Sequence, residues 1–146
     1  MKTKISVSKI FSFEAAHALD GYRGKCKEIH GHSYKMTVTV RGTPNNNIDN
    51  PNCGMVIDFG DVKNIVNERV LPLFDHRLIL RDDSRFRGIE AKNEKVRYVP
   101  YQPTCENMLL EIAKILEPEF YNKLRLFKLR LQETSTSYAE WNLSYD

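Results

Sequence analysis

Residues 3–13 read Thr3-Lys4-Ile5-Ser6-Val7-Ser8-Lys9-Ile10-Phe11-Ser12-Phe13, and their alternation of apolar and polar side chains decides the fold of the chain. Such a period of two is typical of a strand with one buried face, and here only Lys9 and Ile10 break it. Residues 32–41 repeat the pattern. We therefore predict two strands, separated by residues 14–31, a glycine-containing excursion that is too long for a tight hairpin.

Two helices are expected downstream of these strands. The spacing of apolar residues predicts a helix over residues 59–71, which Pro72 ends. A second helix is expected to begin after Thr104, a favourable N-terminal capping residue, and to end before Pro118. Residues 81–97 are rich in charge and show little periodicity, so we expect them to form an exposed insertion between the two helices.

The C-terminal part of the chain returns to an alternating pattern. Residues 124–133 and the segment that contains Ala139 and Trp141 each predict a strand. The order ββααββ indicates one α+β domain over residues 1–146, with an antiparallel four-stranded sheet and both helices on one face. Because the edges of a small sheet tend to pair with other strands, we also expect a homo-oligomer.

Composition limits the classes of function. The 146 residues include 22 Lys and Arg against 19 Asp and Glu, a net charge of +3 that is too small to support nucleic-acid binding by charge alone. No apolar run is long enough for a membrane span or a secretory signal, so we expect a cytoplasmic protein without a membrane partner. Cys26, Cys53 and Cys105 are an odd number without paired spacing, which argues against a disulfide framework.

Three of the four histidines, His17, His30 and His32, lie in or beside the excursion between the first two strands. His30 and His32 are two residues apart at the start of a strand, so their side chains share one face. His17 follows the first strand and should lie beside them. Three imidazoles leave one position of a tetrahedral zinc site open, as in catalytic sites. Cupins and carbonic anhydrases also use three histidines, so a metal does not by itself name the reaction.

Cys26 lies four residues before His30 in a basic neighbourhood. Nearby positive charge and a metal favour the thiolate, which would make Cys26 a base or a nucleophile. A fourth metal ligand and a buried spectator remain alternatives. The Asp75-His76 pair, just after the first helix, is either a proton relay for Cys26 or an ordinary helix-end pair.

Together these motifs resemble the 6-pyruvoyl tetrahydropterin synthase family, which includes the 6-carboxytetrahydropterin synthases. The matching segments span nearly the whole chain in the order found in the family. They are Phe13-Glu14-Ala15-Ala16-His17, Cys26-x-x-x-His30-Gly31-His32-Ser33-Tyr34, Ile57-Asp58-Phe59, Asp75-His76, Pro103-Thr104-Cys105-Glu106-Asn107 and Glu133-Thr134.

The resemblance implies a tunnelling fold, in which trimeric barrels stack as a hexamer. It also implies that His17, His30 and His32 hold a zinc ion.

The resemblance further implies the roles of the remaining site residues. Cys26 would transfer protons, with Asp75 and His76 completing its relay. Glu133 would hold the pterin ring, because a carboxylate matches the adjacent N–H donors of that ring. The other recognition residues implied are Thr104 and Glu106.

The implied substrate is 7,8-dihydroneopterin triphosphate. The short spacing between Cys26 and His30 favours the branch of the deazaguanine (queuosine-type) pathway, which forms 6-carboxy-5,6,7,8-tetrahydropterin with loss of triphosphate and acetaldehyde. The alternatives are a 6-pyruvoyl tetrahydropterin synthase, a pterin-binding oligomer without turnover, and a zinc hydrolase that needs no thiol.

Three departures from the family pattern stand out. Cys105 replaces the usual Ser or Thr, which removes a hydroxyl contact from the pocket motif. Glu28 is either a second acid or base, which would direct cleavage toward a hydroxymethyl pterin, or a solvent-exposed side chain. The basic residues of segment 81–99 either contact triphosphate or form a solvated face.

Overall fold

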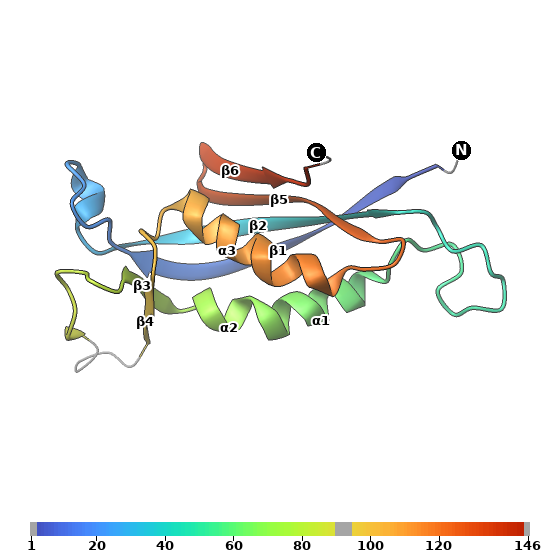
Figure 1. The fold of residues 1–146 in the computed structure, drawn as a ribbon, viewed down its shortest axis with the longest axis horizontal. Helices are drawn as coiled ribbons and strands as arrows, with labels where there is room; N and C mark the ends of the chain where they lie inside the picture. Colours follow the sequence, from blue (N-terminus) through green and yellow to red (C-terminus); the bar gives the residue numbers. More distant parts are fainter. Residues whose placement is uncertain (1–2, 90–94, 145–146) are drawn as a thin grey trace.

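The computed structural model describes residues 3–89 and 95–144, in which a six-stranded sheet carries the helices on one face (Figure 1). The strands are β1 (Ile5–His17), β2 (His30–Gly42), β3 (Arg77–Arg81), β4 (Val96–Val99), β5 (Arg125–Thr134) and β6 (Ser137–Asn142), in the spatial order β4-β3-β1-β2-β5-β6. The helices are α1 (Phe59–Arg69), α2 (Leu71–Phe74) and α3 (Cys105–Leu116), with 3-10 turns η1 (Lys25–Lys27) and η3 (Glu117–Glu119). Within the described residues, no helix has the length and apolar character needed to cross a membrane.

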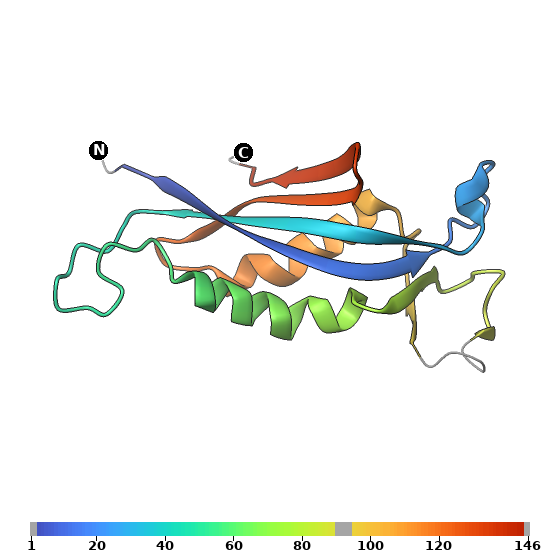
Figure 2. The ribbon, with the colours of Figure 1, turned by 180° about the vertical axis from the view of Figure 1, so that it is seen from behind.

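The four predicted strands form the antiparallel part of the sheet, as expected. β1 and β2 pair over their whole length, from Ile5 opposite Gly42 to His17 opposite His30. β5 then pairs with β2, and β6 with β5, both antiparallel. Figure 2 shows β1 and β2 running along the length of the molecule, with the helices below them and β6 above them in this view. The α+β class and the order of these elements are confirmed.

The prediction of a four-stranded sheet was wrong, because two further strands extend it. β3 pairs parallel with the end of β1, and β4 pairs parallel with β3. β3 carries a continuous apolar run, residues 78–80, which is typical of a parallel strand covered on both faces and does not show the alternation of a half-exposed strand.

The prediction that residues 81–97 form an exposed insertion was also wrong in part. The segment begins with the last residue of β3 and ends within β4. Phe86 and Ile89 pack against the small cluster of Ala18, Leu78 and Leu80. Residues 90–94 of the expected insertion lie outside the described residues.

The helix boundaries follow local capping chemistry. The Asp58 side chain accepts a hydrogen bond from the Gly60 amide at the start of α1, and Thr104 accepts one from the Asn107 amide at the start of α3. The helix expected over residues 59–71 is divided, since α1 ends at Arg69 and α2 begins at Leu71. Pro72 is tolerated there because the first turn of a helix does not use its amide hydrogens.

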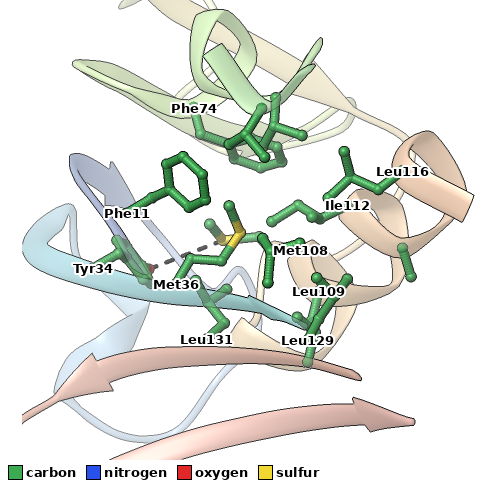
Figure 3. Close-up of a cluster of buried hydrophobic side chains, with 14 of the residues drawn as sticks. Phe11, Tyr34, Met36, Phe74, Met108, Leu109, Ile112, Leu116, Leu129 and Leu131 are labelled. Atoms are coloured by element: carbon green, nitrogen blue, oxygen red, sulfur yellow. Dashed lines mark hydrogen bonds between the residues drawn. The ribbon is translucent and has the colours of Figure 1, made fainter. Parts of the chain in front are cut away.

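The main core lies between the sheet and the helices (Figure 3). Tyr34 and Met36 of β2 and Phe11 of β1 face Phe74 of α2 and Met108 of α3. The alternation of β1 and β2 continues along this same face beyond the core, toward their paired ends at His17 and His30. The packing that orders the sheet therefore also fixes the position of the histidines.

Candidate metal centre and adjoining pocket

The pairing of β1 with β2 brings the three histidines together. His17 lies directly opposite His30, and His32 lies two residues further along β2, on the same face. One ring nitrogen from each of the three residues lies within 4.8 Å of the others. His17 is buried and the other two are half-buried. Residues that are up to fifteen positions apart in the sequence thus form one cluster at the rim of the sheet.

Backbone carbonyls fix the orientation of two of these rings. Nδ1 of His17 lies 2.6 Å from the Pro103 carbonyl oxygen, and Nδ1 of His30 lies 2.8 Å from the Glu28 carbonyl oxygen. A carbonyl only accepts hydrogen bonds, so each Nδ1 is the donor and each Nε2 of a neutral ring carries a lone pair. Such outer hydrogen bonds are typical of histidines that bind metals.

The two Nε2 atoms that are left face each other. Nε2 of His17 and Nε2 of His30 are 2.9 Å apart. Burial lowers the pKa of His17 below 6.5, outweighing the Pro103 carbonyl and the Glu133 carboxylate, which raise it, so the neutral ring is favoured at pH 7. Two lone pairs at this distance repel each other unless a cation lies between them. The donor set therefore fits a metal ion bound by imidazole nitrogens.

Glu133, at the end of β5, lies against the histidine cluster. Its Oε1 atom is 3.3 Å from Nε2 of His17 and 3.4 Å from Nε2 of His32, and it accepts a hydrogen bond from the Tyr34 hydroxyl. Burial, and then the Glu133 charge, raise the pKa of Tyr34 above 10, so that its hydroxyl stays protonated as a donor. The carboxylate thus brings negative charge to the imidazoles as well as to the space beside them.

A pocket of about 470 Å³ opens next to the cluster. Cys26, a half-buried residue on the turn η1, lines the same space as His17 and Glu133. The volume lies within the usual range for small-molecule sites. Six of the residues singled out in the sequence line the pocket: His17, Cys26, Thr104, Cys105, Glu106 and Glu133.

Asp75 and His76 do not line the pocket that holds Cys26. The Asp75 carboxylate accepts a hydrogen bond from the Glu14 amide and lies 3.7 Å from Nε2 of His76. The side chain of His76 is 66% exposed, and its backbone has a positive φ of 58°. Both residues line a different hollow, beside Arg77. Within one chain, the structure therefore does not bring the expected relay to Cys26.

With this geometry in view, the chain can be compared with known proteins. A family model described as 6-pyruvoyl tetrahydropterin synthase matches residues 6–143. The chain belongs to this family. It is 36% identical over 140 residues to the 6-carboxy-5,6,7,8-tetrahydropterin synthase of Haemophilus influenzae, covering 92% of this chain and 96% of that one. It is 30% identical over 141 residues to the same-named protein of Rickettsia typhi, covering 93% and 99%.

Solved structures of the 6-pyruvoyl tetrahydropterin synthase family share the fold. The Caenorhabditis elegans 6-pyruvoyl tetrahydropterin synthase superposes with a TM-score of 0.71 at 24% identity, covering 98% of both chains. The expected tunnelling fold is confirmed, with more strands than the sequence predicted.

Two departures from the family pattern now have a structural explanation. Cys105 is buried at the start of α3, and its thiol donates to the Leu131 carbonyl. Burial, followed by the charge of Glu133, raises the pKa of this thiol to about 12, so it stays neutral beside the pocket. The side chain of Glu28 is 59% exposed and pairs with Arg85 instead of lining the pocket.

Sequence reasoning missed two polar residues that line this pocket, Asp20 and Gln102. Asp20 is nearly buried, and its backbone carbonyl accepts a hydrogen bond from the Gln102 amide. Neither residue belongs to a recognisable motif. Only the contact between the excursion and the segment before α3 reveals them.

Proposed function

We propose that the chain is a zinc-dependent lyase that converts 7,8-dihydroneopterin triphosphate to 6-carboxy-5,6,7,8-tetrahydropterin, triphosphate and acetaldehyde. The observation that carries this proposal is the pocket in which Cys26 faces His17 and Glu133. The names of the relatives at 36% and 30% identity support the choice of product.

In this proposal His17, His30 and His32 hold the zinc ion. A bound zinc ion would supply Lewis acidity toward the hydroxyl groups of the substrate side chain. The Cys26 thiolate removes a proton from the side-chain carbon, which allows triphosphate to leave. Glu133 accepts hydrogen bonds from the pterin ring and so fixes the side chain against Cys26, while Thr104 and Glu106 line the same recognition pocket.

We assign Asp75 and His76 to the pocket of a neighbouring copy of the chain. Both lie on a hollow at the surface, and His76 is exposed. β4 and β6 are the edges of the sheet within one chain, and strand edges favour pairing between copies. A homohexamer built as a dimer of trimers would supply such neighbours. The Asp75-His76 relay would then orient Cys26 and accept its proton, which restores the thiolate.

The atoms of the proposed reaction balance with one added water. The substrate and water together yield the carboxylated tetrahydropterin, acetaldehyde and triphosphate. The ring is reduced while the side chain is oxidised, so no external redox cofactor enters. The pyruvoyl product, by contrast, forms by loss of triphosphate without added water.

The test is to incubate the zinc-loaded protein with dihydroneopterin triphosphate in ¹⁸O-labelled water. The proposal predicts a carboxylated product that carries the label, and acetaldehyde captured by a hydrazine reagent. The pyruvoyl product without acetaldehyde would reassign the chain to the other branch. Bound but unconverted substrate would indicate a pterin-binding oligomer, and ester hydrolysis that survives Cys26→Ala would indicate a zinc hydrolase.

A further inference from the structure

The segment that carries Cys26, residues 18–29, has little internal support. It leaves the sheet after His17 and returns at His30 (Figure 1). Between these points the Leu19 amide donates to the Cys26 carbonyl at 2.9 Å, and three longer backbone hydrogen bonds, one from Tyr22 to Leu19 and two in the turn η1, complete the set. None of its residues adds to the buried core apart from Ala18 and the nearly buried Asp20. Something outside the segment must therefore hold Cys26 in place.

Gln102 supplies one such contact, to the Asp20 carbonyl, and Arg85 supplies contacts on both sides of Cys26. Figures 1 and 2 show residues 82–89 at the same end of the molecule as the Cys26 segment. One guanidinium nitrogen of Arg85 donates to the Lys27 carbonyl at 2.7 Å and to the Glu28 carboxylate at 3.2 Å. The Arg85 amide donates to the Asp20 carboxylate at 3.1 Å, and its Nε lies 3.8 Å from the same oxygen. A single residue thus contacts both arms of the segment, on either side of Cys26.

The carboxylate that Arg85 contacts on Asp20 is buried. The side chain of Asp20 is 7% exposed, and its second carboxylate oxygen is buried without a hydrogen-bond partner among the described residues. A buried carboxylate is costly without a nearby positive charge, which Arg85 provides. Asp20 lines the pocket together with Cys26.

The residues that Arg85 contacts after Cys26, Lys27 and Glu28, lie next to the histidine cluster. The Glu28 carbonyl orients the ring of His30, and Lys27 and Glu28 are the first two residues of the three that separate Cys26 from His30. A guanidinium is suited to this position because its planar group can hold several acceptors at once, which an ammonium on a flexible stem does less well.

We infer that Arg85 is a positioning residue that holds Cys26 against the histidine cluster. Its polar contacts within the described residues are with Asp20, Lys27 and Glu28 and not with any of the three histidines, so it acts through those residues. The effect on turnover rests on the proposed function, whereas the effect on the Cys26 segment does not. Arg85 of the charged segment after β3 would then have a structural role, in addition to the triphosphate contact or solvated face considered for the basic residues of this segment.

The test compares Arg85→Ala and Arg85→Lys with Arg87→Ala. Arg87 is a matched control because its guanidinium stacks on Tyr98 and donates to the Asp82 carbonyl, inside its own segment. The rate of alkylation at Cys26 by iodoacetamide is followed by peptide mass spectrometry, with the exposed Cys53 as internal reference.

Arg85→Ala should alkylate at Cys26 about tenfold faster than the wild type, because it loses the guanidinium's hydrogen bonds to the Lys27 carbonyl and the Glu28 carboxylate, although the backbone amide still donates to Asp20. Removing a positive charge by itself disfavours a thiolate, so a faster reaction reports a loosened segment. The alkylation rate of Cys26 in Arg85→Lys should lie between those of the wild type and Arg85→Ala. If Arg85→Ala does not fold, Arg85→Lys is compared with the wild type in its place. With substrate, kcat should fall about 10–100-fold while KM changes little, as expected when a reacting group is misplaced.

Alkylation of Cys26 within twofold of the wild type in the Arg85 variants would overturn the inference, as would an equal change in Arg87→Ala. If the alkylation rates change as expected but the wild type converts no pterin, the positioning role stands and the proposed function fails. If the wild type is active and the Arg85 variants match it in both measurements, only the positioning role fails.

Discussion

Replacing His30 with alanine should change the stability of the metal-free chain little and that of the zinc-bound chain strongly. In the structure the His30 ring makes a hydrogen bond to the Glu28 carbonyl, and its Nε2 lies 2.9 Å from that of His17, so without a metal the two lone pairs would repel each other. The hydrogen bond stabilises the fold by about 1 kcal/mol, and the opposed lone pairs offset part of it. Without metal, His30→Ala should therefore unfold within about 4 °C of the wild type.

Zinc should raise the unfolding temperature of the wild type well above that of His30→Ala. At a thousand times its Kd, a ligand stabilises the folded state by about 4.1 kcal/mol, which corresponds to about 8–16 °C for a chain of this size. Loss of a ligand should weaken binding by at least about 100-fold, the upper end of the effect of removing an outer-shell partner. At the same zinc concentration, His30→Ala would then gain about 1.4 kcal/mol or less.

The assay is thermal unfolding at one fixed protein concentration, with chelator and then with zinc. His76→Ala is the matched control, because His76 is exposed and lies outside the three-histidine cluster. It should keep the full zinc-dependent shift. A wild-type shift in His30→Ala, or a lost shift in His76→Ala, would refute the assignment of the cluster as the metal centre.

Three further substitutions test other parts of the account. Cys26→Ala should abolish most turnover while zinc content and pterin binding, measured by fluorescence titration, stay at wild-type levels; retained turnover would remove Cys26 from the mechanism. Glu133→Gln should weaken pterin binding about 10–100-fold, the cost of a lost charge-assisted hydrogen bond, and unchanged affinity would place the ring elsewhere. Burial raises the pKa of Glu111, but hydrogen bonds from Arg97 and Tyr101 outweigh burial and lower this pKa below 4.5. The Glu111 carboxylate therefore stabilises the fold above pH 4.5. This stabilisation is lost as the pH falls through the lower pKa of the folded state. Urea unfolding should therefore show a smaller loss of stability on acidification for Glu111→Gln than for the wild type, and parallel pH profiles would contradict this.

The sequence predicts the antiparallel part of the fold well because those strands have one buried and one exposed face. The alternation in β1 and β2 sets both their burial and the shared face of His30 and His32. β3 was missed because its apolar run is only three residues long and shows no alternation, and because its burial depends on a parallel neighbour and on packing by Phe86 and Ile89.

The candidate site was predictable where its residues lie on paired strands or in short motifs. The contact of Glu133 with His17 and His32 depends on the end of β5 reaching the rim of the sheet, a long-range arrangement. The separation of Asp75 from the Cys26 pocket could not be predicted either, because sequence order does not tell whether two motifs meet within one chain or between copies.

The most direct test of the central claim is a crystal structure of the zinc-loaded protein, with the metal located by its anomalous scattering. The account predicts one peak about 2.0–2.1 Å from Nε2 of His17, His30 and His32, with an open position toward the pocket and with Cys26 facing it unbound. A peak elsewhere, or a site closed by the sulfur of Cys26, would contradict it.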